Sequence, residues 1–259
     1  MKHLAFIALA LAVACTDTSD EAPAKDAGAH DVATESGDAS TGGAADASAG
    51  DAGDVSTTAD AAPEADALAE AGKSCKKVAH IGDSLSAYTV DPLTKAYAAV
   101  GVSADIDAYG GRAIKQKLPA DPKTGKQAAL DFNAAGFDGC WVVALGTNDT
   151  ANVAAGAWYT RAEAIDEMME AIDPTATDPV MWVNTITTKT TGYYSNDNMK
   201  LWNQALNEAL TRWPNLKVFD WAAIAATGSA PFADGIHHTT AGYAVRNKAI
   251  AEAFVAKYP

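Results

Sequence analysis

The sequence predicts a three-layer α/β/α sandwich around a five-stranded parallel sheet, with the flavodoxin-like strand order 2-1-3-4-5. Short apolar runs alternate with segments of helical periodicity, which is typical of a parallel sheet covered by helices on both faces. Small and polar residues follow several of these runs directly. Residues 73–259 are numerous enough to form one domain with a substantial core.

The chain begins with a candidate export signal. Residues 1–14 combine a short basic start with an unbroken apolar run from Leu4 to Ala14. This run is too short to cross a bilayer as a helix and is typical of a signal peptide. Cys15 follows at once, as in bacterial lipoprotein signals, so lipidation of Cys15 is predicted. The alternative is an ordinary secretory signal in which Cys15 is incidental. Either way we expect an exported protein, and the lipoprotein interpretation places it on a bacterial outer membrane or cell surface.

Residues 15–72 are predicted to be a disordered linker between the anchor and the domain. Ala, Asp, Ser, Thr and Gly dominate this segment, and no aromatic residue follows Cys15 until Tyr88. Such a composition buries too little apolar surface to offset the entropy of ordering. Residues 1–72 also carry 14 acidic and 2 basic side chains, which is −12 of the formal net charge of −14. The domain is therefore nearly neutral, and no basic patch indicates nucleic-acid binding.

The elements of the domain follow from its pattern. The predicted strands are Lys77–Gly82, 104–109, 140–145, 180–185 and 216–220. The predicted helices cover 91–100, 126–135, 158–172, 197–213 and 240–257. No apolar run in the domain is long enough for a transmembrane helix. Because functional groups in such sheets gather beyond the carboxyl ends of the strands, the residues that follow each strand are the candidates for a site.

The first strand ends in Gly82-Asp83-Ser84-Leu85. A small residue lets the chain turn sharply and presents Ser84 at the sheet edge. Alternatively, Asp83 and Ser84 only cap the helix that follows. We interpret Asp83, like Asp149 after the third strand, as a residue that fixes its loop through hydrogen bonds.

Two further strand ends carry candidate hydrogen-bond donors. The second strand ends in Tyr109-Gly110-Gly111-Arg112, where a glycine lets a backbone N–H approach a substrate oxygen closely. The third is followed by Gly146-Thr147-Asn148-Asp149, whose Asn148 amide can donate to the same oxygen. The alternative for both segments is a simple turn, in which Gly, Asn and Asp are common.

A carboxylate precedes a histidine by three residues in Asp234-Gly235-Ile236-His237-His238. Asp234 can accept a hydrogen bond from Nδ1–H of His237 and so leave Nε2 free to act as a base. His238 is an alternative base, although its separation from Asp234 breaks the three-residue spacing.

These segments resemble, in order, the four sequence blocks of the SGNH/GDSL hydrolase family. The matching positions are Gly82-Asp83-Ser84, Gly111, Asn148 with Gly146 and Asp149, and Asp234 with His237. The resemblance covers residues 75–259. It implies a catalytic triad of Ser84, His237 and Asp234. It also implies an oxyanion hole made by the backbone N–H groups of Ser84 and Gly111 and the side chain of Asn148, with Gly110 as an alternative to Gly111. No cofactor or metal is implied. No G-x-S-x-G elbow occurs, which argues against an ordinary α/β-hydrolase.

The resemblance implies hydrolysis of short-chain acyl esters through an acyl-enzyme. Residues 218–221, ahead of the Asp234 segment, resemble a branch of the family that acts on O-acetyl groups, so an acetylated carbohydrate is a candidate substrate. The alternatives are an O-acyltransferase that uses the same triad and a non-catalytic surface binding module. Candidate pocket walls are Tyr193 and Tyr194 in the 185–198 loop, Trp158 with Tyr159, and the segment 221–232.

The remaining cysteines lie at the starts of two strands. Cys75 precedes the first strand and Cys140 begins the third, and the predicted order makes these strands parallel neighbours about 4.8 Å apart. Disulfides persist in exported proteins. A structural Cys75–Cys140 disulfide is therefore predicted at the edge opposite the triad, with two free buried thiols as the alternative.

Overall fold

The computed structural model describes residues 75–117 and 122–259. The predictions of a signal peptide at 1–14, lipidation at Cys15 and a linker over 15–72 lie outside the described residues. The five strands form one sheet in the order β2-β1-β3-β4-β5, and every neighbouring pair is parallel. The strands are β1 (Lys77–Gly82), β2 (Ser103–Ala108), β3 (Cys140–Ala144), β4 (Val180–Val183) and β5 (Leu216–Phe219). The predicted fold class and strand order are confirmed.

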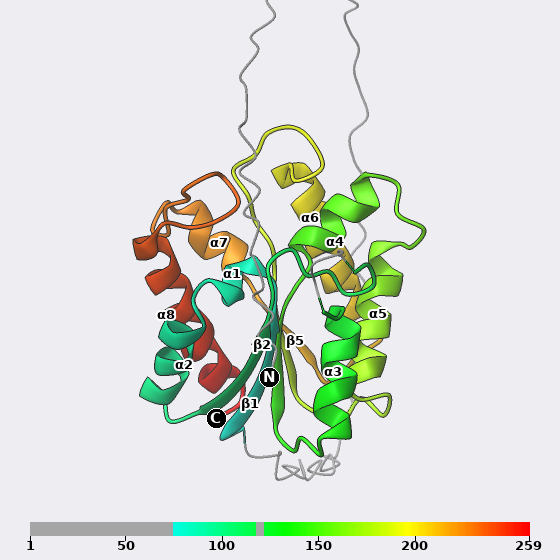
Figure 1. Ribbon diagram of the computed structural model, residues 1–259, viewed down its shortest axis with the longest axis vertical. Helices are drawn as coiled ribbons and strands as arrows, with labels where there is room; N and C mark the ends of the chain where they lie inside the picture. The colour runs from blue at the N-terminus through cyan, green and yellow to red at the C-terminus, as the bar shows by residue number, and fades with distance from the viewer. Residues whose placement is uncertain (1–74, 118–121) are drawn as a thin grey trace, which may run out of the picture. The chain divides into compact units, whose positions relative to one another are not determined.

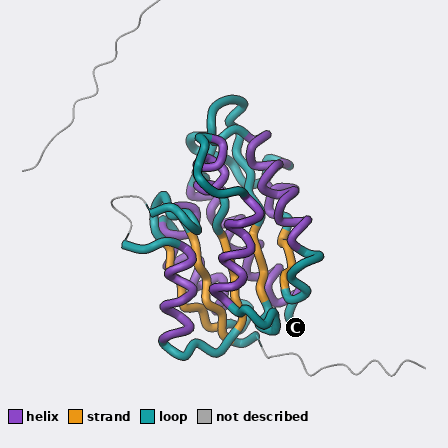
Figure 2. Tube along the Cα trace, turned by 90° about the vertical axis from the view of Figure 1, so that its right-hand side faces the viewer, coloured by secondary structure: helices purple, strands orange, loops and turns teal. Residues whose placement is uncertain are grey.

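Helices cover both faces of this sheet (Figure 1). They are α1 (Ser84–Ala87), α2 (Val90–Ala99), α3 (Gly125–Ala134), α4 (Thr147–Ala154), α5 (Arg161–Ile172), α6 (Asn196–Ala209), α7 (Trp221–Ala226) and α8 (Thr240–Lys257). Figure 2 shows the strands behind one of the helical layers. Within residues 75–117 and 122–259, no helix is both long and apolar enough to cross a membrane.

The core is divided by the sheet into two apolar clusters. Along β3, Trp141 and Val143 face the layer that contains α3, α5 and α6, whereas Val142 and Ala144 face α2, α7 and α8. This division follows from the alternation of side chains along a strand. Because β3 is buried on both faces, its sequence is uniformly apolar, as is typical of a central parallel strand.

One predicted helix begins later than expected. The sequence predicts a helix from residue 158, but α5 begins at Arg161 because Thr160 caps it. The Thr160 hydroxyl accepts a hydrogen bond from the Glu163 N–H, and the Glu163 carboxylate accepts one from the Thr160 N–H, at 3.2 and 2.7 Å. This capping box fixes the start of the helix and leaves Trp158 outside it.

The turn after β1 depends on a close approach at Gly82. A Cβ atom at this position would lie 2.5 Å from the Cβ of Ser86, so a larger residue would push α1 away from the strand. Asp83 then caps α1, since its Oδ1 accepts a hydrogen bond from the Leu85 N–H at 2.9 Å. Together these residues place Ser84 at the carboxyl end of β1, as the first residue of α1.

A disulfide joins Cys75 to Cys140, with their Cα atoms 5.3 Å apart. Cys75 lies two residues before β1 and Cys140 is the first residue of β3, so the bond crosses between neighbouring strands at their amino ends. This prediction is confirmed. The bond joins residues that are 65 positions apart in the sequence, and it lies at the end of the sheet opposite Ser84.

Candidate active site

Ser84, His237 and Asp234 form a continuous hydrogen-bonded line. The Nε2 atom of His237 lies 2.9 Å from the Ser84 Oγ, and its Nδ1 lies 2.7 Å from the Asp234 Oδ2. Because an ionised carboxylate only accepts, Nδ1 carries the proton and Nε2 presents its lone pair to the serine hydroxyl. His238 is turned away, with its Nδ1 3.2 Å from the Ala230 carbonyl oxygen. The structure thus brings His237, and not His238, to the serine.

Asp234 is held by its own turn as well as by the histidine. Its Oδ1 accepts hydrogen bonds from the backbone N–H groups of Ile236 and His237, at 2.8 and 2.7 Å. The bond from the His237 side chain, followed by these backbone bonds, lowers the pKa of Asp234 below its usual range. The carboxylate is therefore ionised at neutral pH and fixes the tautomer and the orientation of the imidazole.

A cavity of about 260 Å³ opens beside Ser84. Its lining includes Ser84, Gly111, Asn148 and His237, but not Gly110. Gly111 has a φ of +77°, a conformation that side chains rarely adopt, and it is one of the residues that line the cavity. In the described part of the chain, neither the Ser84 N–H nor the Gly111 N–H has a hydrogen-bond acceptor. Two backbone N–H groups without an acceptor and one carboxamide thus belong to residues that line the same cavity as the serine, and donors in such a place can stabilise an oxyanion.

The carboxamide of Asn148 is fixed by bonds on both of its sides. Its Nδ2 donates to the Arg112 carbonyl oxygen at 3.0 Å, and its Oδ1 accepts from the Tyr194 hydroxyl at 3.1 Å. These two bonds orient Nδ2 and leave its second hydrogen for a ligand. The sequence singled out Tyr194 only as a pocket wall. Its bond to Asn148 depends on the course of the long β4–α6 loop, for which the sequence carries no signal.

We expect Tyr194→Phe to lower kcat for a small aryl ester about two- to tenfold with little change in KM. The substitution removes one hydrogen bond, a loss of about 0.5–1.5 kcal/mol, and leaves the Asn148 amide free to rotate away from the oxyanion. Tyr193→Phe is the matched control, because Tyr193 is 59% exposed and does not line the cavity. In an Asn148→Ala background the Tyr194 substitution should have no further effect. If Tyr194→Phe lowered kcat in that background as much as it does in the wild type, Tyr194 would not act by positioning Asn148.

Asp149 ties the start of α4 to the loop after β2. Its Oδ1 and Oδ2 accept from the Ile114 N–H at 2.9 and 3.1 Å, and its Oδ1 also accepts from the Tyr159 hydroxyl at 3.3 Å. Burial of this carboxyl raises its pKa to about 7. Burial likewise raises the pKa of Asp83, the cap of α1. Both aspartates therefore support the loops of the site, as their positions after β1 and β3 predict.

The raised pKa of Asp149 predicts a pH-dependent stability. Between about pH 4 and pH 7 the folded state retains a proton that the unfolded state has released, so the contribution of this group to stability falls as pH rises through that window. Asp149→Asn removes the titration and should flatten the decline in the free energy of unfolding, measured by urea unfolding from pH 5 to pH 8. Parallel profiles for the two proteins would refute the assignment.

The structure places the other predicted pocket residues in different environments. Tyr194 lines the cavity, whereas Trp158 lines a different one and Tyr159 is buried. The prediction that the segment from Trp221 forms a wall is wrong. Trp221 is buried because it begins α7 and faces the core, with its ring 5.4 Å from that of His238.

Sequence reasoning also missed Tyr88, an exposed cavity residue whose ring lies 5.4 Å from that of His237. Its place beyond the short helix α1 gave no periodic signal. In the parts of the chain that the structure describes, no group of three or more His, Cys, Asp or Glu side chains is placed to hold a metal ion.

No family model and no curated protein sequence matches the chain. The chain is, however, similar to several solved structures. A lipase/acylhydrolase from Enterococcus faecalis is 18% identical, with a TM-score of 0.56, over 71% of this chain and 97% of the other. A carbohydrate acetylesterase from Sinorhizobium meliloti is 18% identical, with a TM-score of 0.55, over 71% and 100%. The catalytic domain of a peptidoglycan O-acetyltransferase from Streptococcus pneumoniae is 16% identical, with a TM-score of 0.53, over 71% and 97%. These similarities show that the chain has the SGNH/GDSL hydrolase fold.

Proposed function

We propose that the protein is a serine ester hydrolase that cleaves short-chain acyl esters through an acyl-enzyme, with Ser84, His237 and Asp234 as its triad. The observation that carries this proposal is the line of hydrogen bonds from Asp234 through His237 to Ser84, which ends at a cavity that Gly111 and Asn148 also line. A serine hydroxyl is a weak nucleophile until a base removes its proton, and this geometry supplies that base. The fold similarity to acylhydrolases and acetylesterases supports the same reaction class.

The reaction follows from the positions of these atoms. As the Ser84 Oγ attacks the ester carbonyl carbon, its proton passes to Nε2 of His237, and Asp234 stabilises the imidazolium. The N–H groups of Ser84 and Gly111 and the Asn148 amide donate to the oxyanion, each worth about 3 kcal/mol by comparison with a measured oxyanion-hole deletion. The Nε2–H proton then moves to the departing alcohol oxygen. Water repeats the sequence on the acyl-enzyme, releases the carboxylic acid and restores Ser84.

A short acyl group attached to a carbohydrate is the substrate we propose. The cavity beside Ser84 measures about 260 Å³, which suits an acetyl group better than a long acyl chain. Similarity to a carbohydrate acetylesterase and to a peptidoglycan O-acetyltransferase domain agrees with acetyl chemistry on sugars. The predicted export signal at residues 1–14, with Cys15 directly after it, supports a lipid-anchored enzyme outside the bacterial cytoplasm, where such polymers occur.

A second candidate is transfer of the acyl group to a sugar hydroxyl in place of water. The similarity to an O-acetyltransferase domain favours this option, because both reactions share one acyl-enzyme. Product analysis with an added sugar acceptor separates them: hydrolysis yields free acid, whereas transfer yields a newly acylated acceptor.

A chain-length series tests the proposed hydrolysis. The full protein should hydrolyse 4-nitrophenyl acetate and butyrate faster than the octanoate, and a serine-reactive phosphonate should label Ser84 once per chain. Absence of both hydrolysis and labelling would overturn the proposal and favour a non-catalytic binding module.

A further inference from the structure

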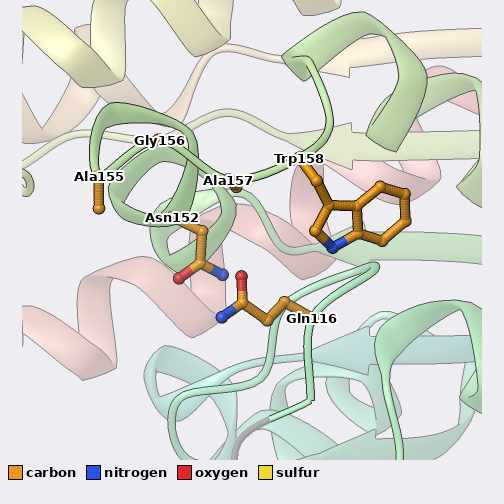
Figure 3. Close-up of a pocket in the computed structure, with 6 residues that line it drawn as sticks. All are labelled: Gln116, Asn152, Ala155, Gly156, Ala157 and Trp158. Atoms are coloured by element: carbon orange, nitrogen blue, oxygen red, sulfur yellow. The ribbon is translucent and has the colours of Figure 1, made fainter.

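A second cavity, of about 490 Å³, is lined in part by the loop and the helix that also line the candidate active site. It is lined by Gln116, Asn152, Ala155, Gly156, Ala157 and Trp158 (Figure 3). Its volume lies in the range of about 300–1,000 Å³ found for small-molecule sites. None of the reactions described above uses these residues.

The same two segments line both cavities. Gly111 of the β2–α3 loop and Asn148 of α4 face the serine, whereas Gln116 of that loop and Asn152 of that helix face the second cavity. Asn148 and Asn152 are one helical turn apart, about 6 Å along the axis of α4. A ligand with its ester carbonyl at Ser84 can therefore continue over α4 into the second cavity.

Trp158 is the unusual residue of this cavity. Its side chain is 76% exposed, whereas Trp141, Trp182, Trp202 and Trp221 are buried and Trp213 is partly buried. The indole is nevertheless held in place: the Lys115 ammonium lies 4.4 Å from its ring centroid and is paired with Glu167, and the Tyr159 ring packs edge-on at 5.3 Å. An exposed aromatic ring with a fixed orientation is a preformed stacking surface.

The remaining lining is uncharged and consists of two carboxamide side chains and three small residues. Figure 3 shows the carboxamides of Gln116 and Asn152 pointing toward one another across the cavity, with the Trp158 indole beside them. In the described part of the chain, the Gln116 carboxamide has no partner, and Asn152 uses only Nδ2, which donates to the Tyr159 hydroxyl at 3.3 Å. The rest of the lining, Ala155 to Ala157, is small and leaves room for a ring. Among the residues that the structure describes, no charged side chain lines the cavity, so none of them favours an anion there.

We infer that this cavity is a glycan subsite, which binds a pyranose ring of an oligosaccharide whose acylated residue lies at Ser84. The apolar C–H face of the sugar stacks on the indole of Trp158, whose ring face is electron-rich. The free donors and acceptors of Gln116 and Asn152 bond to its hydroxyls. This inference rests on the proposed ester hydrolysis, and it specifies the substrate as an acylated oligosaccharide of more than one residue.

Binding is tested apart from catalysis in the full-length Ser84→Ala protein. The probes are xylotetraose and the β-1,4-linked tetramer of N-acetylglucosamine, titrated by calorimetry. We expect one of them to bind and to protect tryptophan fluorescence from acrylamide, because Trp158 is the most exposed indole. Adding Trp158→Ala should weaken binding about tenfold, and Trp158→Phe should weaken it less. Leu130→Ala, which removes a 41% exposed side chain on α3, is the control and should change nothing.

Activity measurements separate this inference from the proposed function. Trp158→Ala should raise KM for the O-acetylated form of whichever tetramer binds and leave hydrolysis of 4-nitrophenyl acetate unchanged. Gln116→Ala, at an exposed residue without a partner, provides a second test if loss of Trp158 impairs folding. If neither tetramer binds, the subsite is overturned. Hydrolysis of the aryl ester by the wild type would still support the function of Ser84. A selective loss of activity on 4-nitrophenyl hexanoate in Trp158→Ala would also overturn it and assign the cavity to an acyl chain.

Discussion

Replacing Ser84 with alanine is expected to lower kcat for ester hydrolysis about 10⁴- to 10⁶-fold. The substitution removes the nucleophile that forms the acyl-enzyme, and the oxyanion donors alone supply only the residual acceleration. His237→Ala should cost about as much, because the histidine 2.9 Å away is the base that activates the serine. The double variant should be no slower than either single one, since the two residues act as a unit.

The controls for this series lie within the same domain. Ser103→Ala changes an exposed serine at the amino end of β2, remote from the cavity, and should retain full activity. Asp234→Asn should keep the fold but lower kcat by about 10⁴, because an amide at this position no longer enforces the required histidine tautomer. Full hydrolysis by Ser84→Ala, with its unfolding transition unchanged, would end the proposal of a covalent route.

Removal of the Cys75–Cys140 bond should lower the free energy of unfolding by about 4 kcal/mol. The estimate follows from the loop entropy that a crosslink over 65 residues removes from the unfolded chain. Cys75→Ala/Cys140→Ala is the variant to compare with the wild type in urea, with and without reductant. While folded, the variant should keep its kcat, since the bond and the cavity lie at opposite ends of the sheet.

Chemical reduction of the Cys75–Cys140 disulfide in the wild type is the matching control. The reduced wild type should unfold near the urea midpoint of the double variant, and the reductant should not shift the variant itself. A midpoint in the variant equal to that of the oxidised wild type would show that the bond adds no stability. A large loss of activity at low temperature would show instead that the bond shapes the site.

The central strands β3 and β4 were predictable because each is a short, wholly apolar run, and β1 was predicted to the residue. The edge strands β2 and β5 also contain polar or charged residues. The helices α1, α4 and α7 were not predicted, since four to eight residues are too few to show a 3.6-residue period. This explains why a simple turn was the alternative interpretation of the Asn148 segment, although Asn148 lies in the first turn of α4. It also explains why Trp221, read as part of a loop, was assigned to a pocket wall although α7 turns it into the core.

The polar residues of the site were predictable from their places after β1, β2 and β3 and from the spacing of Asp234 and His237. The side chains that surround these polar residues were not predictable. The Tyr194 hydroxyl reaches Asn148 from a residue 46 positions away, and the Trp158 cavity combines two distant segments. Such contacts depend on the course of loops between elements, and residue periodicity carries no information on that course.

The crosslink at the base of the sheet also determines how the domain bears mechanical load. A pull on the chain ahead of Cys75 would, without the bond, act first on β1. With Cys75 joined to Cys140, the force also passes covalently into β3, the central strand, so that two strands share the load. The serine lies beyond the far end of β1, whose six residues span about 20 Å. Load that enters ahead of Cys75 would thus be borne at the end of the sheet opposite the candidate active site.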